Sequence, residues 1–188
     1  LKGLETERFR KQIDLRGQSN AKIEIPLRHF YRTADFAEVP PFMARGPSVA
    51  GLAEWRTYLG AQVGANRPQG VLVLPFPTAA GDPAVLNRFV LDQTRDAGDA
   101  ARAALLLSPG MEPSDLGSTL DDPQVGGFKV YHVYARRQPT FDATISEFVP
   151  EWAWRYAHER GWFVMLHIVK TRAIADSVSD DELSSKFV

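Results

Sequence analysis

The chain has 188 residues, of which 44% are hydrophobic, and this is enough apolar material for the core of one domain. Its 22 basic and 23 acidic residues give a formal net charge of -1, so neither nucleic acid nor an anionic membrane is an expected partner. Cysteine is absent, which excludes disulfides and thiolate sites. No apolar run is long enough to span a bilayer, and we expect a cytoplasmic protein.

Residues 1–50 predict an N-terminal extension and an irregular loop region. Residues 23–27 alternate as a strand would, but Pro26 argues against a central strand. Prolines and glycines mark residues 40–47 as part of a long loop, and such loops often contribute to binding sites. His29 precedes two aromatic residues in this region. We interpret it as a packing residue, with a substrate contact as the alternative.

Residues 51–188 predict part of a β/α barrel, because helical and strand patterns alternate along them. An amphipathic helix is expected over 51–65, a doubly buried strand over 70–78, and a helix that begins at Asp82-Pro83. A second apolar strand follows over 103–109. Alternating strands and helices are typical of a parallel sheet.

The remaining elements continue this alternation to the end of the chain. Two turns or a short helix precede a strand over 126–134, and a helix over 146–161 leads into a strand over 162–170. Ser179 and Glu182 then have the spacing of a capping box. No G-x-G-x-x-G or P-loop motif is present, so we favour about four parallel strands of a TIM barrel over a nucleotide-binding open sheet.

Two of these strands each carry an ionisable side chain among apolar neighbours. Lys129 lies in GGFKVYHVY and His167 lies in WFVMLHIVK. Because strand side chains alternate between faces, Lys129 shares a face with Tyr131, and His167 lies opposite the aliphatic face of its strand. A face with these groups suits a barrel interior, where barrel enzymes place their active sites at the carboxyl ends of the strands.

The residue types leave several roles open. His167 is a metal ligand, a general base or a core histidine satisfied by a neighbour. Lys129 is a carboxylated bridging ligand, a cation for an anionic substrate, a Schiff-base lysine, or one half of a buried ion pair. We interpret His132, on the helix-covered face, and His158, on an exposed helix flank, as structural.

The stretches GGFKVY, ISEFVPEWAWRYAHERGWFVMLHIVK and RAIAD resemble the metal-dependent hydrolases of the amidohydrolase superfamily, nearest to the branch of amidohydrolase-2 proteins and decarboxylases. The resemblance covers roughly residues 69–183 and implies a (β/α)8 barrel with a divalent metal, zinc or manganese. It implies that His167 is a metal ligand and that Lys129 bridges metals or stays an ordinary lysine. Metal-activated water would then attack a C–N or C–O bond of a small molecule, with Tyr131 as a substrate contact.

The chain departs from this superfamily in its ligand set. The His-x-His motif of the first strand is missing, and the ligands of the sixth and eighth strands would lie beyond Val188. We therefore expect a partial chain, whose open sheet edges favour self-association into a homo-oligomer. The alternatives are a non-catalytic remnant without a complete metal site, a metal-dependent decarboxylase of the same superfamily, and a Schiff-base aldolase that uses Lys129.

Overall fold

The computed structural model describes residues 30–41, 43–66, 68–78 and 81–168. The strands are β1 (Tyr31–Arg32), β2 (Val49–Ala50), β3 (Val71–Val73), β4 (Ala101–Leu107), β5 (Val125–Tyr131) and β6 (Phe163–His167). The helices are α2 (Leu52–Val63), α3 (Pro83–Arg95), α4 (Pro113–Leu116) and α5 (Glu151–Arg160). The alternating stretch at 23–27, His29 and the capping box at Ser179 lie outside the described residues.

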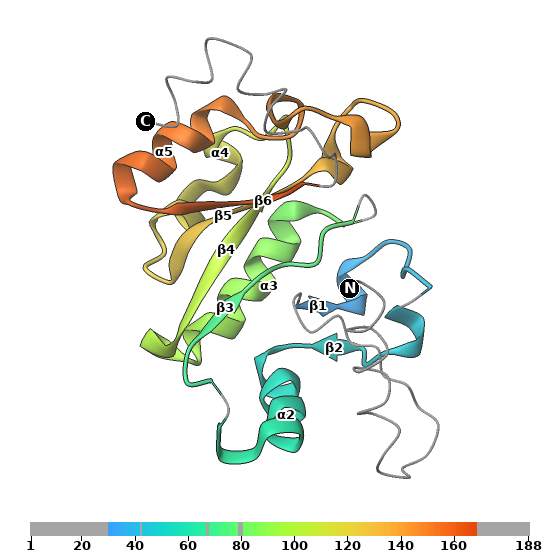
Figure 1. The fold of residues 1–188 in the computed structure, drawn as a ribbon, viewed down its shortest axis with the longest axis vertical. Coiled ribbons are helices and arrows are strands. Elements are labelled where there is room, and N and C mark those ends of the chain that lie inside the picture. The colour runs from blue at the N-terminus through green and yellow to red at the C-terminus, as the bar shows by residue number, and fades with distance from the viewer. Residues whose placement is uncertain (1–29, 42, 67, 79–80, 169–188) are drawn as a thin grey trace, which may run out of the picture.

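Four strands form one parallel sheet in the order β3-β4-β5-β6, which curls into a half barrel (Figure 1). A helix stands between each pair of consecutive strands of this sheet, as a parallel sheet requires. The predicted α/β class with four parallel strands is therefore confirmed. β1 and β2 pair separately as a short antiparallel sheet that contacts α3.

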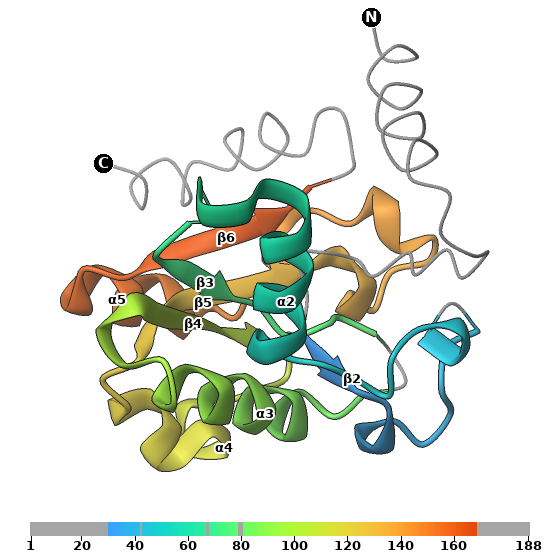
Figure 2. The ribbon, with the colours of Figure 1, turned by 90° about the horizontal axis from the view of Figure 1, so that it is seen from below.

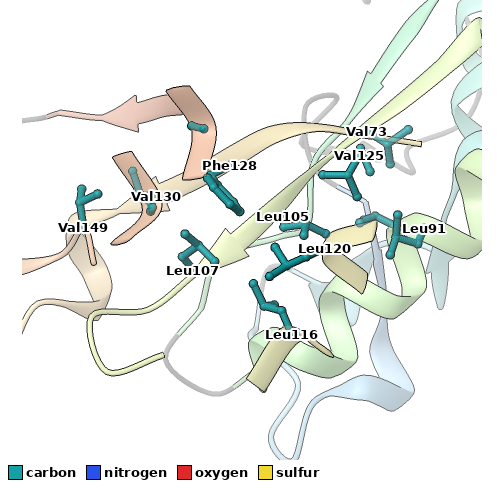
Figure 3. Packing of buried hydrophobic residues seen from close by; sticks show 14 of the residues in the cluster. Val73, Leu91, Leu105, Leu107, Leu116, Leu120, Val125, Phe128, Val130 and Val149 are labelled. Carbon is teal, nitrogen blue, oxygen red and sulfur yellow. The ribbon is translucent and has the colours of Figure 1, made fainter. Parts of the chain in front are cut away.

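The outer face of the sheet packs under α3, α4 and α5, and Figure 2 shows α3 and α4 together on one side of it. Leu105 and Leu107 of β4 meet the side chains of Leu116 and Leu120 there (Figure 3). The ring of Phe128 in β5 makes edge-on contacts with the ring of Trp152 in α5 and with the ring of Trp162 just after this helix. This buried apolar layer is the main core of the described structure.

A buried amide completes the hydrogen bonding of β4. β3 pairs with β4 only as far as Ala103, so the β4 backbone beyond that point lacks a strand partner on this side. Asn87 of α3, which is 1% exposed, takes the place of the missing strand. Its side chain donates to the carbonyl oxygen of Leu106 at 2.9 Å and accepts from the amide nitrogen of Leu106 at 2.7 Å. Both backbone groups are thereby satisfied in the core.

The inner face of the sheet is covered by the chain that precedes α2. Tyr31 and Met43 pack in one cluster with Leu106 of β4 and Tyr131 of β5. Phe30 also pairs in parallel with Pro75, just after β3, through hydrogen bonds from Phe30 to Leu74 and from Phe76 to Phe30. The described part of the predicted loop region thus lies against the same sheet face as the candidate site.

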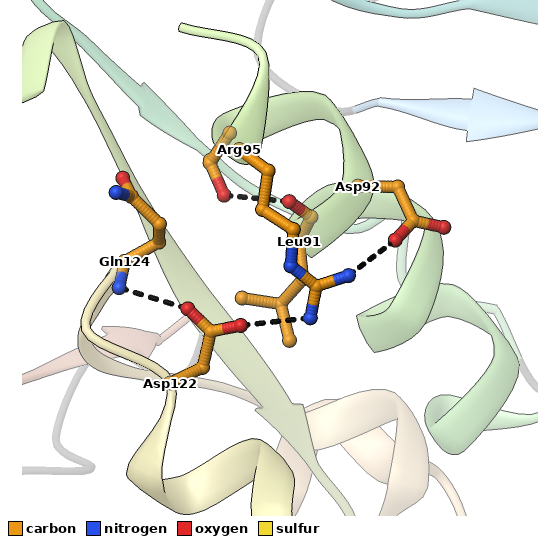
Figure 4. A network of polar contacts seen from close by, with 6 residues as sticks. Leu91, Asp92, Arg95, Asp122 and Gln124 are labelled. Carbon is orange, nitrogen blue, oxygen red and sulfur yellow. Dashed lines mark hydrogen bonds and ion pairs between the residues drawn. The ribbon is translucent and has the colours of Figure 1, made fainter. Parts of the chain in front are cut away.

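Charged side chains join the end of α3 to the turn before β5 (Figure 4). The guanidinium of Arg95 forms ion pairs with Asp92 at 2.7 Å and with Oδ2 of Asp122 at 2.8 Å. The other carboxylate oxygen of Asp122, Oδ1, accepts a hydrogen bond from the backbone N–H of Gln124 at 2.9 Å. The side chain of Arg95 is 55% exposed, so solvent weakens these ion pairs to roughly 0–1 kcal/mol each. They orient the turn more than they stabilise the fold.

Helix starts follow the predicted signals in one case and not in another. Asp82 caps α3 by accepting a hydrogen bond from the amide of Ala84 at 2.8 Å, with Pro83 in the first turn, as predicted. The helix expected from residue 146 instead begins at Glu151, because Pro150 adopts an extended conformation as its N-cap. The preceding segment Ile145–Glu147 forms a separate 3-10 turn.

The amphipathic helix predicted over 51–65 buries only part of its apolar stripe, which runs from Leu52 to Val63. α2 forms close to its expected place, and Leu52 at its start is buried. Val63 at the other end of the stripe is 44% exposed, so this helix covers the core with its first turn alone. Within the described ranges, no helix is both long enough and apolar enough to traverse a bilayer.

Candidate functional site

The predicted lysine and histidine come together at the carboxyl ends of β5 and β6. In the register of these parallel strands, Lys129 lies beside Met165 and Tyr131 lies beside His167. All four residues belong to the face that is turned away from α5, while Phe128 packs on the opposite side. The predicted alternation of Lys129 and Tyr131 against Phe128 is confirmed.

Lys129 is the charged residue of this face. It is 4% exposed, and its Nζ donates a hydrogen bond to the carbonyl oxygen of Met165 at 3.3 Å. The same nitrogen lies 4.2 Å from the centre of the Tyr131 ring, within the range of a cation–π contact. Burial lowers the pKa of Lys129 to about 8, because the charged form loses hydration.

His167 ends β6 with an exposed side chain, so it borders the site rather than lying inside it. Its ring stacks on that of Tyr131, with centres 4.9 Å apart. Partial burial lowers the pKa of His167, and the positive charge of Lys129 and the neighbouring His132 lower it further. The neutral imidazole is therefore favoured, which is the form that binds metal ions or accepts a proton.

His132 is part of this cluster, contrary to the predicted place on the helix-covered face. The strand ends at Tyr131, and His132 begins a 3-10 turn, so the alternation of faces stops one residue before it. Its ring stacks on that of His167 with centres 5.6 Å apart, and its Nδ1 lies 3.2 Å from Oγ1 of Thr140. Val133 and Tyr134 continue the apolar run after His132, so no local signal in the sequence marks this early strand end.

Tyr134 ties two loops together beside the cluster. Its hydroxyl donates to the carbonyl oxygen of Thr78 and accepts from the amide of Thr78, both at 3.2 Å. This pair connects the loop after β3 to the turn after β5. Burial raises the pKa of Tyr134 to about 12, and burial also raises the pKa of Tyr131, so both phenols are neutral at physiological pH.

The donors present fit only part of a metal centre. Two imidazoles and a partly desolvated amine are ligands or ligand precursors for a divalent ion. However, no three His, Asp or Glu side chains within the described ranges approach closely enough to hold one, and a catalytic zinc normally has three protein ligands. His158 is exposed on α5, as predicted, and lies apart from this cluster.

The chain was also compared with proteins already characterised. No family model, curated protein or solved structure matches it. The features that bear on function are the half barrel and the group formed by Lys129, Tyr131, His132 and His167, which we call the β5–β6 cluster.

Proposed function

We propose that the chain is part of a (β/α)8 barrel of the amidohydrolase type, and that this barrel hydrolyses a C–N or C–O bond of a small molecule. The observation that carries the proposal is the placement of Lys129 and His167. They lie on neighbouring parallel strands, on one face, at the carboxyl end of a curled sheet. Barrel enzymes assemble their active sites from this end of the strands.

In this proposal each side chain has a defined task. His167 binds a divalent ion, zinc or manganese, through its neutral imidazole. Lys129 holds the substrate or bridges to the metal site, and Tyr131 forms a wall against which the substrate packs. When bound, the ion supplies Lewis-acid activation of water. Because a complete ligand set is not found among the described residues, we assign no catalytic step to it.

A barrel relative without a metal centre is the second candidate, and a specific observation favours it. The β5–β6 cluster contains two histidines and a lysine but no carboxylate ligand in the part of the chain described. A protein of this kind would retain the scaffold and bind a small molecule without hydrolysing it. A metal-dependent decarboxylase would use the same donors as the hydrolase, and substrate screening separates those two.

Metal retention distinguishes the first candidate from the second. The protein is equilibrated with zinc by dialysis, and bound zinc is quantified for the native chain, His167→Ala and His158→Ala. His158 is exposed on α5 and serves as the matched control for adventitious binding to a surface imidazole. The proposal expects the native chain and His158→Ala to retain more zinc than His167→Ala. Equal retention by all three would refute a metal-binding role for His167.

A further inference from the structure

The β5–β6 cluster contains a buried cation that has no anionic partner among the described residues. No carboxylate forms an ion pair with Lys129 in the described ranges, where its amine contacts one carbonyl oxygen and one aromatic face. An ammonium group has three donors, so the described residues satisfy only part of its hydrogen-bonding capacity. Buried charges are otherwise paired in proteins, because an unpaired one loses its hydration without compensation.

The neighbours of Lys129 also favour a negative ligand. His132 and His167 place two imidazoles, each able to donate one hydrogen bond when neutral, at the same ends of the strands. No carboxylate of the described residues offsets the positive charge of Lys129 at this site, so an anion would be attracted to it.

The amine of Lys129 is directed toward the exposed end of β6. The Lys129 side chain starts one inward-facing position below Tyr131, yet its Nζ lies over the Tyr131 ring. The amine therefore extends toward the carboxyl ends of the strands, where Tyr131 stacks on the exposed His167. β6 is the last strand of the described sheet, so this side of the cluster has no further described strand over it.

We infer that the β5–β6 cluster binds a small organic carboxylate, whose oxygens accept hydrogen bonds from Nζ of Lys129 and from the imidazole of His167. The exposed imidazole of His167, which stacks on the rings of Tyr131 and His132, offers a flat surface to the body of such a ligand. This inference rests on the proposed function and names its substrate class: the scissile bond would belong to a molecule that carries a carboxylate.

Benzoate and benzamide test the inference, because they have the same shape and differ in charge. Each is titrated into the native chain in a buffer that contains EDTA, and the shifts of the Tyr131 and His167 amide resonances are followed. A charge-assisted hydrogen bond predicts that benzoate binds about tenfold or more tightly than benzamide. Neither probe is an aldehyde or ketone, so no Schiff base contributes. Equal affinities would overturn the inference.

Two variants locate the effect. Lys129→Met keeps most of the side-chain volume and removes the buried charge, so it should fold and should bind the two probes equally. Arg136→Met removes an exposed cation from the turn after β5 and should retain the preference for benzoate. Preference for benzoate that survives in Lys129→Met would also contradict the inference. Since no metal is present, this result is independent of the zinc measurement that tests the hydrolase proposal.

Discussion

Replacing the buried Asn87 by alanine should strongly destabilise the protein. The side-chain amide forms two hydrogen bonds, of 2.7 and 2.9 Å, with the backbone of Leu106 in the centre of the core. Alanine would leave a buried N–H and a buried C=O without partners, at about 1–3 kcal/mol each. Alanine favours the helix by about 0.6 kcal/mol over asparagine, which offsets part of this loss. We expect the free energy of unfolding to fall by about 3 kcal/mol.

Urea denaturation followed by circular dichroism measures this change. Arg88→Ala is the matched control, because Arg88 is the next residue of α3 and its side chain is exposed. The control should change the free energy of unfolding by less than about 0.5 kcal/mol. A loss below about 1 kcal/mol in Asn87→Ala, with an unchanged denaturant slope, would refute the view that this amide replaces a strand partner of β4.

Two further substitutions test the sheet and the loop after β5. A Cβ added at Gly127 would overlap the carbonyl oxygen and the ring of Phe163, so Gly127→Ala should lower stability by about 1–3 kcal/mol in thermal melts. Gly110→Ala is the control, because Gly110 has open space around it and its substitution should not lower stability. Arg137 donates to Glu147 at 2.8 Å and, as the largest cause, lowers the pKa of Glu147 from 4.5 to about 2. A carboxyl group with a lowered pKa stabilises the fold above pH 4.5 and loses this effect as the pH falls toward 2. The difference in melting temperature between the native chain and Glu147→Gln should therefore shrink over that range, and a constant difference would contradict this ion pair.

The parallel sheet and its outer core were predictable because strong local signals agree with them. Leu105 and Leu107 lie in a continuous apolar run, which indicates a strand buried on both faces, and β4 is buried in this way. Asp82 with Pro83 marks the start of α3 through a cap that depends on neighbouring residues alone. Lys129 stood out because an ammonium group is rare in such a strand.

Features that depend on distant residues were not predictable in this way. His132 joins the cluster because β5 ends at Tyr131, and the pairing with β6, which ends at His167, extends no farther. The role of Asn87 follows from how short β3 is, which its apolar sequence does not reveal. The apolar stripe of α2 failed as a guide to burial, because helical spacing indicates which residues share a face and not whether a partner covers it.

Paramagnetic broadening by Mn²⁺ tests the proposed metal-dependent barrel most directly, because it reports where on the molecule the ion binds. Substoichiometric Mn²⁺ is added to the labelled chain, and amide signals are compared between the native protein and His167→Ala. We predict selective loss of the Tyr131 and His132 signals in the native chain and their recovery in the variant. Broadening confined to residues near exposed carboxylates such as Asp99 and Asp115, and unchanged in His167→Ala, would contradict a metal site at the carboxyl ends of β5 and β6.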